Sequence, residues 1–148
     1  MTMTYQTIVV AVDGSKEAEW ALKKAIQIAK RNGAKLILTH IIDSRGFTTV
    51  EAHDYALAER SEQYANELLE RYKNEAVAAG LDDVDTAVEF GSPKVKIAKD
   101  VAPKYKADLI ICGATGLNAV ERFLIGSVSE NIVRYAKCDV LVVRTPKE

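Results

Sequence analysis

The sequence has few of the residues that mark several common protein classes. Its 148 residues include two cysteines, two histidines, three prolines and one tryptophan, and the formal net charge is −1. Cys112 and Cys138 form no C-x-x-C pair, so we expect two reduced thiols, with a redox pair as the alternative. Basic residues form no block, which argues against a nucleic-acid partner, and no residues have metal-ligand spacing.

Long hydrophobic runs and a signal peptide are also missing. The first residues, MTMTYQTIVVAVD, lack a basic n-region, and their apolar run is too short to span a membrane. We therefore expect a cytoplasmic protein without a membrane partner. A chain of this length buries roughly 68–70% of its unfolded surface, which supports one domain over residues 1–148.

Five short apolar runs are present, and each predicts a strand. Four of them are apolar on both faces, which is typical of strands covered on both sides in a parallel sheet. The third run alternates between apolar and polar residues, which indicates a sheet edge. The expected strands are Thr7–Val12, Lys35–Ile42, Val84–Phe90, Asp108–Cys112 and Val140–Arg144.

Helical patterns with start and stop signals separate these runs. The expected helices extend from Ser15 to Gly33, from about Val50 to Ala79, from Ser92 to Pro103, and from the capping box Ser127-Val128-Ser129-Glu130 onward. Alternating strands and helices predict an α/β fold: a single-domain open five-stranded parallel sheet with helices on both faces, similar to Rossmann folds.

The strand ends indicate where a ligand would bind. The first and fourth expected strands have the most polar and glycine-rich ends, at Asp13-Gly14-Ser15 and at Gly113–Gly116. If these strands are neighbours, the sheet order is 3-2-1-4-5, and the winding reverses between them. Open α/β sheets bind ligands at that point. The same order puts the alternating third strand at an edge.

A candidate anion site follows the fourth strand. Gly113 and Gly116 allow sharp turns, and Gly126 precedes a helix start where the amides of Ser127, Val128 and Ser129 would face an anion. Neither the P-loop motif nor G-x-G-x-x-G is present. Asp13 would lie across the switch point, where it would bond a ribose hydroxyl or a divalent cation held by phosphates. Taken alone, the glycine spacing is equally compatible with turns and caps.

These residues resemble a known signature. The spacing G-x2-G-x9-G-S, from Gly113 to Ser127, together with VAVDGS, THIID, ADLIICGATG and GSVSENIVRYAKCDVLVVR, resembles the nucleotide-binding signature of the universal stress protein family over essentially the whole chain. The resemblance implies an ATP-binding member, with Mg²⁺ or Mn²⁺ bound alongside the nucleotide. It implies that Val12 and Asp13 lie against the adenosine and that Ile41 offers backbone groups to the adenine edge.

The resemblance also implies the full set of nucleotide contacts. They are Ala11, Val12, Asp13, Ile41, Cys112, Gly113, Thr115, Gly116, Gly126, Ser127, Val128 and Ser129. Two residues depart from the family pattern. Thr115 stands where many relatives carry a basic or imidazole side chain, and Asp139 stands where proline is common. Arg122 would either replace the missing cation or be solvated.

The resemblance further implies a homodimer formed through the last strand. An apolar edge strand favours pairing with a copy of itself, so we expect antiparallel pairing around Val140, Leu141, Val142 and Val143. The expected function is a nucleotide-dependent regulatory protein of the stress response.

A slow ATPase or self-phosphorylating protein is the alternative, with Ser127 and Ser129 as acceptors, although the absent P-loop lysine argues against fast transfer. Receiver domains and flavodoxins fit poorly, because the first strand end has one Asp and no hydroxyl-rich loop. His40 is expected to be a hydrogen-bonded core residue, with a place beside the adenine pocket as the alternative.

Overall fold

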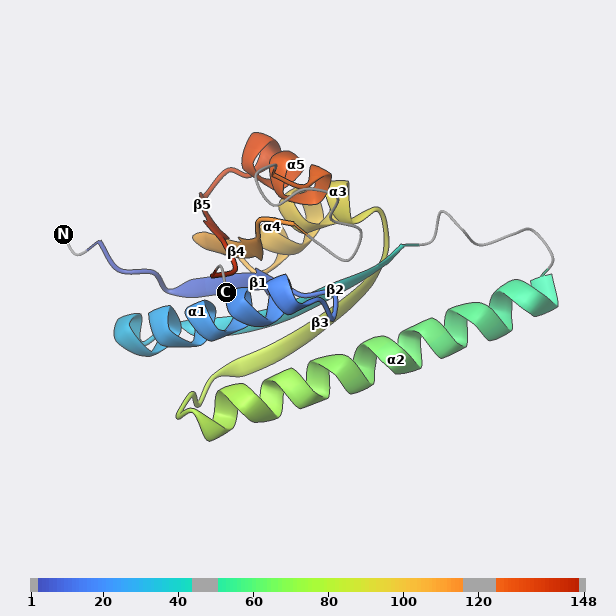
Figure 1. Ribbon diagram of the computed structural model, residues 1–148, viewed down its shortest axis with the longest axis horizontal. Coiled ribbons are helices and arrows are strands. Elements are labelled where there is room, and N and C mark those ends of the chain that lie inside the picture. Colours follow the sequence, from blue (N-terminus) through green and yellow to red (C-terminus); the bar gives the residue numbers. More distant parts are fainter. Residues whose placement is uncertain (1–2, 44–50, 116–124, 147–148) are drawn as a thin grey trace.

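The computed structural model describes residues 3–43, 51–115 and 125–146, and Figure 1 shows their arrangement. Five strands form one sheet in the order β3-β2-β1-β4-β5, and every neighbouring pair is parallel. The predicted order and the predicted edge position of the third strand are confirmed. The strands are β1 (Thr7–Ala11), β2 (Lys35–Asp43), β3 (Val84–Gly91), β4 (Leu109–Gly113) and β5 (Asp139–Val143).

Helices cover both faces of the sheet, as predicted (Figure 1). On one face lie α1 (Lys16–Asn32) and α2 (Glu51–Ala78). On the other face lie α5 (Ser127–Tyr135) and a continuous helical segment made of α3 (Pro93–Lys96), the π-helical turn η2 (Ile97–Val101) and α4 (Ala102–Lys104). None of the described helices is long and apolar enough to cross a bilayer.

Alternate residues of the central strands face two separate hydrophobic cores. Val10 of β1 belongs to the core beneath α1 and α2, where Leu22 and Leu68 also pack. Val9, its neighbour, faces the opposite core together with Ile132 of α5. Burying each such side chain contributes about 1.5–3 kcal/mol to folding. Coverage on both faces explains why these strands have continuous apolar sequences.

The first helix begins and ends as the sequence predicts. The Oγ atom of Ser15 accepts a hydrogen bond from the backbone N–H of Ala18 at 3.1 Å, which caps the start of α1. Gly33 ends the helix with a φ of +63°, a left-handed conformation that glycine adopts without strain.

The third helix ends at Lys104, one residue beyond the predicted end at Pro103. The N–H of Ala102 donates to the carbonyl of Ile97, five residues earlier, which makes η2 a π turn. The backbone stays helical from Val101 into α4, which contains Pro103. Pro103 follows directly after this π turn and has no N–H to donate, and the helix ends one residue later, at Lys104.

The start of β5 is attached to the N-terminal segment. The hydroxyl of Tyr5 donates to the carboxylate of Asp139 at 2.8 Å, and this hydrogen bond raises the pKa of Tyr5. Asp139 is one of the two positions where the sequence departs from the family pattern. A proline could not accept this bond, so the departure gives the chain a connection between two distant segments.

Candidate functional site

A cleft of about 950 Å³ opens where the parallel strands end. It lies at the predicted switch point, because β1 and β4 are neighbours and their chains leave in opposite directions. Gly116 lies outside the described residues. The other predicted contact residues all line this cleft, and they are Ala11, Val12, Asp13, Ile41, Cys112, Gly113, Thr115, Gly126, Ser127, Val128 and Ser129.

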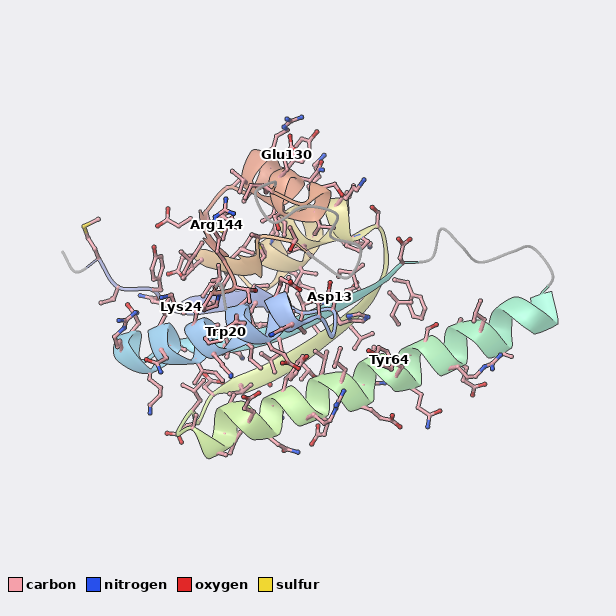
Figure 2. All side chains as sticks on the ribbon, viewed as in Figure 1. Asp13, Trp20, Lys24, Tyr64, Glu130 and Arg144 are labelled. Carbon is pink, nitrogen blue, oxygen red and sulfur yellow. The ribbon has the colours of Figure 1, made fainter. Side chains whose placement is uncertain are left out.

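The first turn of α5 forms one end of the cleft. The predicted capping box is wrong, because Gly126 is the N-cap and no side chain caps the helix. Ser127 is already helical, and the carboxylate of Glu130 pairs with Arg134 at 3.2 Å instead of reaching back. Figure 2 shows Glu130 on the outer side of α5. The amides of the first helical turn have no partner within the helix, so they are available to an anion.

Two hydrogen bonds attach this turn to the end of β4. The backbone N–H of Gly126 donates to the carbonyl of Ala114 at 2.7 Å. The hydroxyl of Ser129 donates to the carbonyl of Gly113. These bonds join the start of α5 directly to the end of β4.

Ser129 and Ser127 therefore differ sharply in accessibility. Ser129 is buried, and its hydroxyl proton is used by the Gly113 carbonyl. Ser127 is exposed at the first helical position. Of the two serines expected as phosphate acceptors, Ser127 alone presents an accessible hydroxyl to the cleft.

Gly113 has a packing reason to be glycine. A Cβ atom at this position would lie 3.1 Å from the carbonyl oxygen of Glu17, in the first turn of α1. That distance is too short for an ordinary contact, and the obstructing atom is backbone. Glycine therefore lets α1 approach β4 closely.

Asp13 lies at the mouth of the cleft, directly after β1. Its Oδ1 atom accepts the backbone N–H of Ser15 at 2.9 Å, which fixes the carboxylate at the start of α1. Gly14 has a φ of +86°, and a Cβ there would lie 2.9 Å from the hydroxyl of Tyr64. Figure 2 shows Asp13 near the strand ends and Tyr64 on the adjacent part of α2. The turn thus needs glycine for its backbone conformation.

Metal binding at Asp13 would depend on a ligand. Among the described residues, no group of three or more His, Cys, Asp or Glu side chains could hold a metal ion. Mg²⁺ commonly binds through one or two carboxylates together with substrate phosphates and water. The single Asp13 carboxylate fits that arrangement, and it does not form a metal site by itself.

The opposite end of the cleft is formed by β2. The last bond between β1 and β2 joins the N–H of Val12 to the carbonyl of Thr39 at 2.9 Å. Next along β2, His40 places its Nδ1 atom 2.8 Å from the carbonyl of Val12. His40 is hydrogen-bonded, as expected, but it is half-buried and lines the cleft, so it is not a core residue. A place beside an adenine pocket stays a prediction.

Sequence reasoning missed one wall of the cleft. Leu57, Arg60, Ser61 and Tyr64 of α2 line it, with Pro93, Lys94 and Ile97 from the segment α3–η2. The spacing of the α2 residues is that of one helical face, the same face that packs into the core further along at Leu68. A change from apolar to polar residues along this face was the available signal, but only the fold shows which element lies opposite.

This wall supplies the described cations of the cleft. Thr115 lines the cleft without a charge, and Arg122 lies outside the described residues. Arg60 and Lys94 also line the cleft, one from α2 and one from α3. Two other elements therefore bring positive charge to the cleft, although Thr115 stands where a basic side chain was expected.

Neither cysteine is poised to react. Both thiols are free, Cys112 is buried, and burial raises its pKa. Burial also raises the pKa of Cys138, and the carboxylates of Asp139 and Asp108 add to the effect. Both groups are thus thiols near neutral pH, which agrees with the expectation of two reduced cysteines.

Together the sheet order and the cleft at its switch point define an open α/β protein of the Rossmann type. Residues 4–144 match the sequence model of the universal stress protein family. A protein of Staphylococcus saprophyticus named as a universal stress protein is 54% identical over 143 residues, 97% of this chain and 86% of its own length. The chain belongs to the universal stress protein family.

Solved structures agree with this assignment. UspA from Lactobacillus plantarum has a TM-score of 0.89 at 29% identity, over 97% of this chain and 100% of its own. A universal stress protein in complex with cAMP has a TM-score of 0.71 at 34% identity, with 97% and 99% covered. The universal stress protein from Archaeoglobus fulgidus in complex with dAMP has a TM-score of 0.62 at 26% identity, with 96% and 100% covered.

The bond from Ser129 to Gly113 leads to a stability prediction. Replacing Ser129 with Ala leaves the Gly113 carbonyl without its donor, so the free energy of unfolding should fall by about 1–2 kcal/mol. Urea denaturation measures this change. Ser127→Ala is the matched control and should stay within about 0.5 kcal/mol of the parent, because its side chain is exposed. Equal midpoints for the two variants would contradict the structural role of Ser129.

Proposed function

We propose that this protein binds ATP, with Mg²⁺ or Mn²⁺, in the cleft and acts as a nucleotide-responsive homodimer in a cytoplasmic stress response. The uncapped first turn of α5 carries this proposal, because it presents free amides and the positive end of a helix dipole to the cleft. The adenine nucleotides in the cAMP and dAMP complexes of related proteins support it.

The two ends of the cleft suit the two ends of a nucleotide. Phosphates would bind at the amides of Ser127, Val128 and Ser129, and the base would lie against Ile41 of β2. One strand, β1, separates β2 from β4, so the ends lie roughly 10 Å apart across the sheet. That separation is comparable with the length of a nucleoside. Asp13, between the two ends, would face the ribose or a phosphate-bound cation.

The cleft is large enough for a nucleotide. Pockets for small molecules have volumes of about 300–1,000 Å³. At about 950 Å³, this cleft is near the top of that range. Arg60 and Lys94 add positive charge to its wall. A bound metal ion would neutralise phosphate charge, while the chain's own residues position the nucleotide.

Slow hydrolysis or self-phosphorylation is the alternative function. It would use Ser127, because Ser129 is buried and its hydroxyl is used by Gly113. The same exposed position gives a direct test of ATP binding, since an acidic residue there would meet the phosphates.

Ser127→Asp should separate ATP binding from folding. The new carboxylate would repel the phosphates and compete for the amides of the helix start, so the Kd for Mg-ATP should rise at least about tenfold, or ~1.4 kcal/mol. Acidic residues stabilise helix N-termini, so the Tm should stay the same or increase. Isothermal titration calorimetry and thermal denaturation measure the two effects.

The neutral variant Ser127→Asn is the matched control, with a similar shape and no charge. It should bind Mg-ATP within a few-fold of the parent protein. The proposal is wrong if the Asp and Asn variants bind Mg-ATP equally well, or if the parent binds none.

The homodimer part of the proposal rests on the free edge of β5. Val140, Leu141 and Val142 are only half-buried, although all are apolar. The carbonyl of Val143 accepts the N–H of Ala114, so Val143 directs its backbone groups toward β4 and Val142 directs its own toward the free edge. An unpaired apolar edge favours strand addition by a second copy.

Val142→Pro should therefore prevent dimer formation without breaking the sheet. It removes an N–H that points away from β4, and proline is tolerated on an edge strand. Light scattering should give twice 16.2 kDa for the parent protein and 16.2 kDa for this variant. Val142→Thr, which keeps the N–H and the branched side chain, should stay dimeric. A monomeric parent, or a dimeric proline variant, would refute pairing at this edge.

A further inference from the structure

The ladder of hydrogen bonds between β1 and β2 ends one bond earlier than the alternation of the two segments would allow. Within the ladder, odd-numbered residues of β2 direct their backbone groups toward β1, as Lys35 does to Gln6 and Thr39 does to Val12. By the same alternation, the next bond would join the N–H of Ile41 to the carbonyl of Val12. No such bond is present between these two described residues.

The imidazole of His40 occupies the place of that missing bond. Its Nδ1 atom lies 2.8 Å from the carbonyl oxygen of Val12. A carbonyl oxygen only accepts hydrogen bonds, so Nδ1 must carry the proton. The ring of Tyr64 packs against the imidazole edge-to-face, with centroids 6.4 Å apart and planes at 72°. This contact with α2 holds the ring in its orientation.

The missing bond leaves the backbone groups of Ile41 without a partner in β1. The Val12 carbonyl accepts from the imidazole, and neither the N–H nor the carbonyl of Ile41 bonds to the backbone of a described residue on the β1 side. Ile41 is 6% exposed and lines the cleft. A backbone donor and acceptor without protein partners are strongly favoured to find other partners. A ligand in the cleft would supply both partners.

We propose that His40 is a positioning residue that reserves the backbone N–H and carbonyl of Ile41 for a 6-aminopurine base. The proposal rests on nucleotide binding in the cleft. An adjacent donor and acceptor match the edge of adenine, where N1 accepts and the 6-amino group donates. In hypoxanthine, N1 donates and O6 accepts, so both contacts become repulsive. His40 therefore sets base selectivity without touching the base.

Comparison of ATP with inosine triphosphate tests this role, because the two ligands differ only at that edge. Titration calorimetry of the parent protein should give an ATP preference of at least about tenfold, since sites built to hydrogen-bond a group discriminate strongly against analogues that lack it. His40→Phe keeps a ring against Tyr64 but has no donor. The Val12 carbonyl would then recover the Ile41 N–H, and the preference should fall to within about threefold of unity.

His40→Asn is the matched variant. Its amide nitrogen lies at the same distance along the side chain as Nδ1 and can donate to Val12, so the ATP preference should be restored. A purely structural role for His40 would not separate the Phe and Asn variants in this ratio. The proposal is overturned if the Phe variant keeps the full ATP preference, or if the Asn variant loses it.

Two outcomes distinguish this proposal from the function on which it depends. Failure of the parent protein to bind ATP at all would remove both. Binding of ATP and inosine triphosphate with equal affinity by the parent would overturn the role of His40 alone. If the Phe variant does not fold, ¹⁵N NMR of the parent imidazole decides: a protonated Nδ1 at neutral pH supports the proposal, and an unprotonated Nδ1 overturns it.

Discussion

The candidate site depends on one constraint. At the carboxyl ends of the parallel strands, the fold leaves several backbone groups without partners. A parallel sheet must reverse its winding once if helices are to cover both faces, and here the reversal falls between β1 and β4. At that point the strands end without neighbours to continue their ladders. The amides at the start of α5 and the amide and carbonyl of Ile41 face the resulting cleft. The side chains around them mainly hold these backbone groups in position.

Three polar side chains perform that holding role. Ser129 attaches the helix start to β4 through the carbonyl of Gly113, and Asp13 accepts the N–H of Ser15 at the start of α1. His40 engages the carbonyl of Val12 at the opposite end. Each of these side chains forms its hydrogen bond with a backbone group of a residue that also lines the cleft. The arrangement is suited to holding a nucleotide in a fixed orientation, and it lacks the lysine with which P-loop proteins speed phosphate transfer.

The sheet could be predicted from the sequence because its determinants are local. Continuous apolar runs identify buried parallel strands, and the alternation in Val84–Gly91 identifies the edge. The predicted capping box at Ser127 is wrong for a physical reason. Serine and glutamate have the right spacing, but Gly126 takes the cap position and Glu130 pairs with Arg134. The sequence pattern does not show which of these competing local bonds is formed.

The α2 wall could not be predicted, because it depends on contacts between distant segments. Tyr64 has the spacing of a core residue, yet it is 51% exposed and lies beside His40 and Gly14. That position follows from the length of α2 and its packing on β2 and β3, which no motif encodes. The same holds for His40, whose bond to Val12 depends on the register between two strands. Strand identity and the local cap at Ser15 were therefore available from the sequence, while the partners of polar side chains that join distant segments were not.

Amide hydrogen exchange, measured residue by residue with and without Mg-ATP, tests most directly whether backbone groups hold the ligand. In the free protein the amides of Ile41, Ser127 and Val128 should exchange faster than those of Ile37 and Leu38, which lie within the sheet ladder. Saturating Mg-ATP should slow exchange at Ile41 and at the α5 start together. Slow exchange at these amides in the free protein, or no change at them when Mg-ATP binds, would contradict the account.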